Sequence, residues 1–171
     1  MESINDVISK LQLAQICWVV MDIHAAVNFF SKSLGISGFP PPELVKAQDL
    51  GMTYRGEVVA GEWLTTQAYN GTTFVELVQP LSGQSMFHDY LNAYPAGGAQ
   101  HFAYRLAVSD FEEVVESLRV GGYEMISEVD HPIARMAFFD TYETIGAVTE
   151  IMGITPEGWN AVEQMKNGTG Q

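Results

Sequence analysis

Two glutamates stand at the centres of two short apolar segments of this chain, Glu76 in FVELV and Glu150 in VTEIM. A carboxylate is costly to bury without a partner, so the same placement in both segments calls for a shared reason. Gln15 and His101 each lie near the start of another apolar segment. Together the four side chains offer one imidazole, one amide oxygen and two carboxylates, a set that suits one divalent ion such as zinc, nickel, cobalt, manganese or iron. Such a set leaves one or two coordination positions open, as a catalytic site requires.

The four side chains can meet if their segments are strands of a curved sheet. Residues two apart on a strand share a face, so Gln15 lies on the face of Cys17, and His101 on the face of Arg105. If each half of the chain folds its sheet into a cup, the first and last strands of both halves surround one centre. Arg105 then either points into the cup, where it could bind an anionic group of a substrate, or pairs with a neighbouring strand.

The order of expected elements repeats along the chain, which predicts an α+β fold of two tandem β-α-β-β-β modules forming a cupped mixed sheet around the metal site. In the first half a strand near 14–20 precedes a helix that Asp22 begins and Gly35 ends; in the second, a strand near 99–106 precedes a helix from Asp110 to Gly121. Each helix is followed by three strand-like pieces, near 52–60, 63–69 and 72–78, and near 123–129, 134–140 and 147–152.

These elements divide the chain into four parts that act together as one domain. We expect a first module over 12–80, a connecting helix or loop over 81–97, a second module over 98–153 and a C-terminal tail over 154–171. The connection follows Pro80 and holds Gly83 and Pro95, and its central part, 85–94, suits a short helix.

The amino-acid composition argues against several classes of binding partner. A hydrophobic fraction of 47% is enough for a packed core, and a net charge of −13 argues against nucleic acid or an anionic membrane as a partner. The longest apolar run is too short to span a bilayer and the N-terminus lacks a signal pattern, so a cytoplasmic location is expected. The single cysteine, Cys17, lies in an apolar run, which is typical of a buried thiol.

Between residues 13 and 152 the chain resembles the vicinal oxygen chelate superfamily, which includes glyoxalase I, methylmalonyl-CoA epimerase, extradiol dioxygenases and antibiotic-resistance proteins. Four segments carry the resemblance, 14–35, 74–80, 97–103 and 139–150, and the second and third are most similar to the epimerase and glyoxalase-like branch. The resemblance implies metal ligands at the start of each module's first strand and inside its last strand. Those positions are Gln15, Glu76, His101 and Glu150.

The ligand types distinguish branches of this superfamily. Many members have histidine at the position of Gln15, but the Gln/Glu/His/Glu set is similar to that of the animal glyoxalase I enzymes, which use zinc. Zinc is therefore the first expectation for the metal, with nickel, cobalt or manganese as alternatives. A single histidine argues against a ring-cleaving dioxygenase, whose iron needs two histidines and one carboxylate.

The resemblance implies an isomerase, epimerase or lyase that moves a proton next to the carbonyl of a small carbonyl compound or thioester. Glu150 is the expected catalytic base, because its counterpart in similar glyoxalases is both ligand and base. The epimerases use a further acid in the first module, a place that Glu57 or Glu62 could fill. A non-catalytic small-molecule binder of the same fold stays open as an alternative, and a dioxygenase relative is a more remote one.

The remaining expectations concern surfaces. His24, His88 and His131 are each expected to face solvent, because they lie at a helix start, on a short helix and before a proline. Each of the four ligand positions also has a structural interpretation: a hydrogen-bonded buried histidine, a polar strand end, or a surface charge on an edge strand. Family members often pair modules between chains, so a homodimer is expected.

Overall fold

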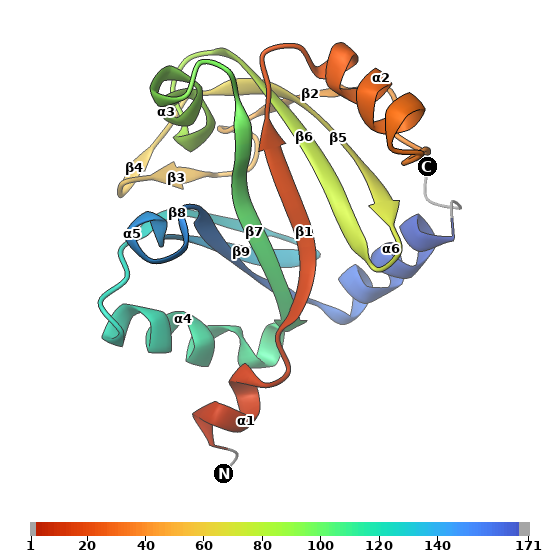
Figure 1. The fold of residues 1–171 in the computed structure, drawn as a ribbon. Coiled ribbons are helices and arrows are strands. Elements are labelled where there is room, and N and C mark those ends of the chain that lie inside the picture. Colours follow the sequence, from red (N-terminus) through yellow and green to blue (C-terminus); the bar gives the residue numbers. More distant parts are fainter. Residues whose placement is uncertain (1–2, 168–171) are drawn as a thin grey trace.

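The computed structural model describes residues 3–167, which form one ten-stranded mixed sheet curled into a cup (Figure 1). The strands lie in the order β2-β5-β6-β1-β7-β10-β9-β8-β3-β4. The predicted α+β fold with a cupped mixed sheet is confirmed. The strands are β1 (Gln12–Val19), β2 (Glu43–Lys46), β3 (Thr53–Tyr54), β4 (Glu57–Val58), β5 (Glu62–Asn70), β6 (Thr73–Ser82), β7 (Gly98–Ala107), β8 (Met125–His131), β9 (Ala134–Asp140) and β10 (Val148–Ile154).

The centre of the sheet joins the two halves of the chain. Strand β1 pairs in parallel with β6 of its own half and antiparallel with β7, which in turn pairs in parallel with β10. The four central strands therefore come two from each half, and they are the strands on which the sequence places the expected metal ligands.

Helices pack against both faces of the curled sheet. They are α1 (Ile4–Ile8), α2 (Ile23–Ser33), α3 (Met86–Ala93), α4 (Phe111–Val120), α5 (Tyr142–Ile145) and α6 (Pro156–Lys166), with a 3₁₀ turn over Val108–Asp110. Helix α2 begins as predicted at Asp22, whose carboxylate accepts from the backbone N–H of Ala25 at 3.0 Å. Phe30 of this helix packs with Leu77 of β6; burying such a side chain contributes roughly 1.5–3 kcal/mol. Helix α4 packs its apolar face on the second half in the same way.

One expected strand of the first half is part of the other half's sheet. The segment expected as a strand over 52–60 is a hairpin, in which β3 and β4 are joined by Arg55 and Gly56 with φ values of 52° and 82°. Its strand β3 pairs with β8 of the second half. The first half completes its own sheet with β2, which pairs with β5. Three consecutive prolines precede β2, so the sequence gives no strand signal there.

A helix occupies most of the segment expected as a C-terminal tail, of which residues 168–171 lie outside the described part. Helix α6 has Thr155 at its N-cap, with the hydroxyl accepting from the N–H of Gly158 at 3.1 Å, and Pro156 in its first turn. Both are helix-start signals that the sequence contains. Helix α6 lies along one end of the cup, where Met165 contacts Gln67 of β5. None of the helices within 3–167 is long and apolar enough to cross a membrane.

Candidate metal centre

Strand register brings the expected ligands to one place on the inner face of the cup. Residues paired across neighbouring strands present their side chains to the same face. Two adjacent rows of paired residues cross the central strands: Glu76, Cys17, His101 and Val148 in one row, and Phe74, Gln15, Ala103 and Glu150 in the next. Each row carries two of the four expected ligands, so all four side chains converge between the rows.

The distances within this group are short. The Gln15 amide nitrogen donates to Glu76 Oε2 at 2.7 Å and lies 3.2 Å from His101 Nε2. His101 Nε2 is 3.1 Å from Glu150 Oε2 and 3.6 Å from Glu76 Oε2. Gln15, His101 and Glu150 are buried, while the Glu76 side chain is 19% exposed. The structure therefore brings together all four residues that the sequence singled out.

The two carboxylates of this group, and the buried oxygen of one of them that lacks a hydrogen-bond partner within residues 3–167, fit a divalent ion. Oxygen Oε2 of Glu150 is buried and, among the described residues, has no hydrogen-bond partner, although His101 Nε2 lies 3.1 Å away. Burial raises the pKa of Glu76; the charge of Glu150 raises it further, and His101 opposes the shift. A divalent ion would neutralise both carboxylates and satisfy the open oxygen. Gln15 would offer its amide oxygen by exchanging the positions of its terminal oxygen and nitrogen.

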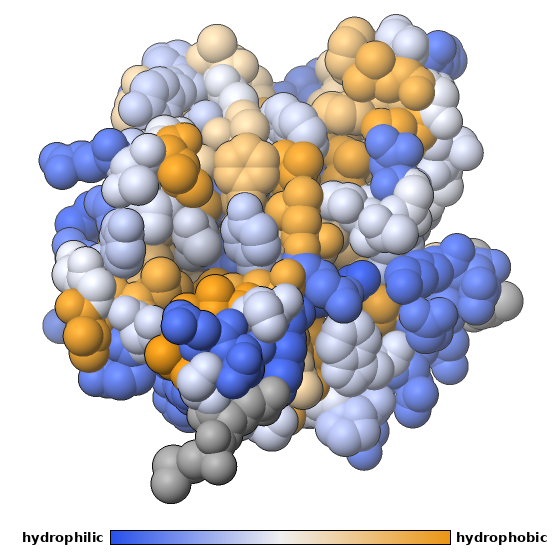
Figure 2. All heavy atoms as spheres, turned by 60° about the horizontal axis from the view of Figure 1, so that its bottom comes forward, coloured by the Kyte–Doolittle hydropathy of each residue, from blue (hydrophilic) through white to orange (hydrophobic). Residues whose placement is uncertain are grey.

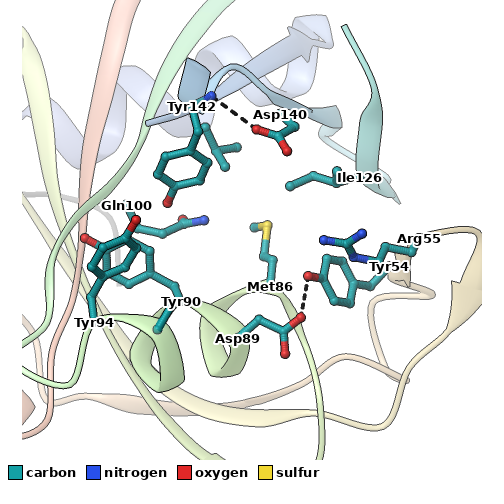
Figure 3. Close-up of a pocket in the computed structure, with 12 residues that line it drawn as sticks. Tyr54, Arg55, Met86, Asp89, Tyr90, Tyr94, Gln100, Ile126, Asp140 and Tyr142 are labelled. Atoms are coloured by element: carbon teal, nitrogen blue, oxygen red, sulfur yellow. Dashed lines mark hydrogen bonds between the residues drawn. The ribbon is translucent and has the colours of Figure 1, made fainter. Parts of the chain in front are cut away.

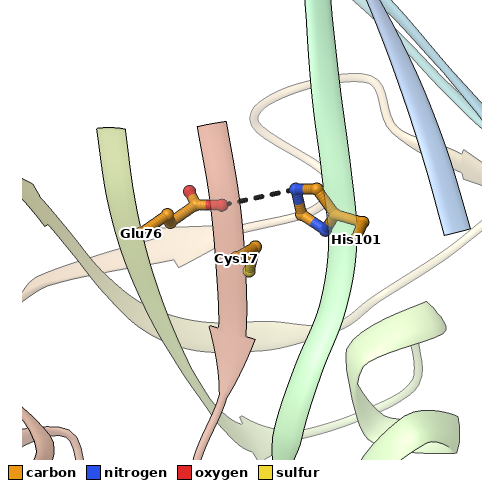
Figure 4. Close-up of side chains that lie close together, drawn as sticks. All are labelled: Cys17, Glu76 and His101. Carbon is orange, nitrogen blue, oxygen red and sulfur yellow. Dashed lines mark ion pairs between the residues drawn. The ribbon is translucent and has the colours of Figure 1, made fainter. Parts of the chain in front are cut away.

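Cys17 belongs to this group, although the sequence indicated only a buried thiol. Its sulfur and ligand atoms of Glu76 and His101 all lie within 4.8 Å of one another, which makes the three a possible ligand triad (Figure 4). The side chain is fully buried. Burial raises the pKa of the thiol, and the adjacent Glu76 carboxylate, to which the thiol is hydrogen-bonded, raises it further. The two-residue spacing from Gln15 was the sequence signal for its place on the same face.

A β-bulge in β7 brings Gln100 to the candidate ligands, although regular strand alternation would place it on the face opposite to His101. Cys17 pairs with His101 and Trp18 with Ala99, so Gln100 is the extra residue on β7. Both Gln100 and His101 are 1% exposed. The Gln100 side-chain oxygen accepts from His101 Nδ1 at 2.6 Å, which leaves Nε2 of the ring to face Gln15 and the two glutamates. Gln100 thus holds the imidazole in the tautomer and orientation that a metal ligand needs.

Replacing Gln100 with leucine is expected to weaken metal binding about 10–100-fold, the usual effect of losing the hydrogen-bond partner of a metal-bound histidine. Gln100→Glu keeps an acceptor at the same place and is expected to retain most of the affinity. Competition with a chelator of known affinity measures both variants. Equal metal affinities of the wild type and Gln100→Leu would mean that Gln100 does not orient the His101 imidazole for metal binding.

A cavity of about 230 Å³ opens beside the candidate ligands. Apolar side chains make most of its wall, among them Met52, Trp63, Phe87, Phe138 and Met152. Within residues 3–167 neither lysine nor arginine lines this central cavity, and its polar groups are the ligand side chains together with Thr65 and Gln67. The cavity therefore suits a small, mainly uncharged molecule placed against the ligand group.

Arg105 lies away from the central cavity. Its guanidinium donates to the Tyr69 hydroxyl at 3.4 Å and lies 5.5 Å from the ring centroid of Trp159 in α6. The side chain is 4% exposed and is not part of the cavity lining. The substrate contact expected of Arg105 stays a prediction, and the lining of the central cavity gives it no support.

The other sequence candidates also lie outside the ligand group. Glu57 is exposed on β4, and Glu62 on β5 forms an ion pair with Lys46 at 3.4 Å; neither lines the central cavity. His24 is exposed, as expected. His88 and His131 are both half-buried instead of solvent-facing. His88 lies 2.8 Å from the Ser85 hydroxyl, and His131 lies beside α6.

Comparisons with known proteins agree with this fold. The sequence profile of the glyoxalase/bleomycin resistance protein/dioxygenase superfamily matches residues 14–138. Solved structures with the same fold include a hypothetical protein of Bacillus halodurans (20% identity, TM-score 0.61, 84% of this chain and 94% of that one). They also include methylmalonyl-CoA epimerase of Mycobacterium tuberculosis (18% identity, TM-score 0.61, 87% of this chain and 91% of that one). A third is a Streptomyces coelicolor methylmalonyl-CoA epimerase bound to 2-nitronate-propionyl-CoA (17% identity, TM-score 0.61, 84% of this chain and 94% of that one). No curated protein matches the chain by sequence.

Proposed function

Because the chain belongs to the glyoxalase/bleomycin resistance protein/dioxygenase superfamily, we propose that it is a divalent-metal-dependent isomerase, epimerase or lyase. It moves a proton on the carbon next to the carbonyl of a small carbonyl compound or thioester. The observation that carries the proposal is the convergence of Gln15, Glu76, His101 and Glu150 in the wall of a mainly apolar cavity.

Gln15, Glu76, His101 and Glu150 would hold the ion. When bound, a divalent ion supplies a Lewis acid that favours negative charge on a carbonyl oxygen. The apolar wall of the central cavity keeps water away from the reacting carbon, which strengthens electrostatic interactions there.

The two glutamates differ in how free their oxygens are, and this difference supports Glu150 as the base. Both oxygens of Glu76 accept hydrogen bonds, Oε2 from Gln15 at 2.7 Å and Oε1 from Thr65 at 3.3 Å. Oxygen Oε2 of Glu150 is unpartnered among the described residues. A carboxylate held by fewer protein donors is the stronger base and is freer to turn toward the substrate, so Glu150 takes the proton from carbon and returns it.

The lining of the central cavity bears on the substrate. The solved epimerases act on methylmalonyl-CoA, whose acyl group carries a free carboxylate. The described lining of this chain's cavity has two carboxylates and neither lysine nor arginine to pair with a third. We therefore assign it an acyl or ketone group that is uncharged and mainly apolar.

A matched pair of short thioesters tests this assignment. The quantity compared is the rate of α-proton exchange with solvent in the presence of the protein, divided by the uncatalysed rate for the same compound. We expect this ratio to be at least about 10-fold higher for 2-methylbutanoyl thioester than for methylmalonyl thioester. The reason is the roughly 1–3 kcal/mol cost of an unsatisfied group in the cavity. Deuterium uptake followed by NMR gives both rates. Preference for the charged ester would contradict the assignment, and absence of exchange with every compound in metal-loaded protein would favour a non-catalytic binder.

Cys17 is expected to stay a thiol beside the side chains that would hold the metal, and not to become a ligand itself. Two glutamates already balance a divalent charge, and a third anion in this buried place would be costly. Cobalt-substituted protein should therefore lack the near-ultraviolet charge-transfer band of a cobalt–thiolate bond, and Cys17→Ser should bind cobalt with the same spectrum. A band that disappears in Cys17→Ser would instead establish the Cys17, Glu76 and His101 triad as ligands.

The homodimer and the cytoplasmic location expected from the sequence stay predictions. Support for the homodimer comes from apolar side chains exposed at α2, where Phe29 and Leu34 are 53% and 54% exposed. Figure 2 shows apolar side chains gathered over this helix, at the upper right. A surface of this kind is typical of a contact between chains. The mass from light scattering tests it.

A further inference from the structure

A second cavity, which we call the tyrosine pocket, opens beside α3 and α5 and shares no lining residue with the central cavity. Four of the seven tyrosines of the chain line it: Tyr54, Tyr90, Tyr94 and Tyr142. Figure 3 shows the last three on one side of the pocket, Tyr54 on the other and Met86 between them. The rings of Tyr90 and Tyr94 are 5.0 Å apart between centroids. Aromatic faces that surround a small space attract cations through their negative quadrupoles.

Two carboxylates complete the wall of the tyrosine pocket. Asp89 accepts from the Tyr54 hydroxyl at 2.6 Å and from the Gln84 amide at 3.1 Å, one donor on each carboxylate oxygen. Asp140 accepts from the backbone N–H of Tyr142 at 3.1 Å. Burial raises the pKa of the Tyr142 hydroxyl, and the neighbouring tyrosines and Asp140 raise it further, so this group stays uncharged. The pocket therefore combines neutral aromatic faces with negative charge.

The rim of the tyrosine pocket already holds one cation. The Arg55 guanidinium lies 5.4 Å from the ring centroid of Tyr54, and the residue is exposed in the turn between β3 and β4. One positive charge at the rim does not cancel two carboxylates, and the net charge of the whole chain is −13. The electrostatic balance of the pocket thus favours a further positive charge rather than an anion.

The geometry points to the tyrosine pocket as a binding site for a small organic cation, of the quaternary ammonium or alkylamine class. Its volume of about 170 Å³ equals that of five to six waters at about 30 Å³ each, which is room for a trimethylammonium head and too little for a nucleotide. Tyr94 is 51% exposed at its mouth, so a short polar arm of the ligand would reach solvent.

Choline and its uncharged isostere 3,3-dimethylbutan-1-ol test the site in the full-length protein. Saturation-transfer NMR should show contact between the choline methyl groups and the protein, and choline should bind at least about 10-fold more tightly than the isostere. Tyr142→Leu is expected to weaken choline binding about 10-fold or more. Arg55→Asn removes the competing cation, suits the left-handed backbone at that position and should strengthen binding.

Two controls separate binding from folding. Tyr94→Leu changes a half-exposed ring and is not expected to affect the fold, yet it should weaken choline binding; Tyr123→Leu, outside the tyrosine pocket, should not. Equal affinities for choline and the isostere would show a merely apolar pocket and overturn the proposal. Absence of saturation transfer from choline at millimolar concentrations in the wild type would overturn it as well.

Discussion

Glu150→Gln is expected to keep the metal and to lose α-proton exchange by about 10²–10⁴-fold, the usual effect of removing a general base. Glutamine retains an oxygen that can bind a metal, as Gln15 is proposed to do, but it does not accept a proton at ordinary pH. Alanine would remove ligand and base together and would not separate the two roles. Deuterium uptake into the thioester and the metal content of the same sample are measured side by side.

Glu76→Gln is the matched control for this experiment. It makes the same chemical change in the equivalent strand of the other half, on a carboxylate whose oxygens already accept from Gln15 and Thr65. We expect a loss smaller than that of Glu150→Gln by at least about tenfold. Equal, small losses in both variants with metal retained would mean that the base lies elsewhere.

His101→Ala is expected to reduce bound metal from close to one divalent ion per chain to almost none. Imidazole is the single nitrogen donor of the proposed set, and its Nε2 lies within 3.6 Å of all three other ligand side chains. Since the loss of an outer hydrogen-bond partner alone costs about 10–100-fold in affinity, the loss of the ligand itself should cost at least about 100-fold.

Elemental analysis after reconstitution with zinc, nickel, cobalt and manganese measures the effect. His24→Ala, on the exposed first turn of α2, is the control and should bind as the wild type does. A wild-type protein that retains none of the four metals would refute the metal site. Undiminished metal in His101→Ala would place the metal on other residues.

The repeated order of elements could be predicted from the sequence because each half contains its own strong local signals. Asp22 and Gly35 bound a helix of the expected length, and the apolar strands with a central glutamate stand out by composition. Strand alternation also placed the four candidate ligands on inward faces. The local sequence pattern was sufficient to predict a strand and the face of each side chain wherever the strand pairs regularly and has one buried face.

The features that could not be predicted depend on pairing between distant segments. A bulge is a property of two strands in contact, so nothing in GAQHFAYR marks Gln100 as the residue that turns inward. The β3–β4 hairpin has a recognisable turn, but its choice of β8 as a partner is decided by tertiary packing. Arg105 shares the face of His101 as expected, yet it lies too far along β7 to reach the central cavity.

The β3–β4 hairpin also determines how the two halves depend on each other. It leaves the first half and extends the sheet of the second beyond β8, while the seam between β1 and β7 joins the halves at the centre. The halves are thus interlocked at two places, although each contributes four adjacent strands to the sheet. Local opening of one half therefore exposes strand edges of the other, so the chain behaves as one cooperative folding unit. A single half would leave the edge of β1 or β7 unpaired and would hold two of the four candidate ligands, so it would need a second copy of itself to complete the site.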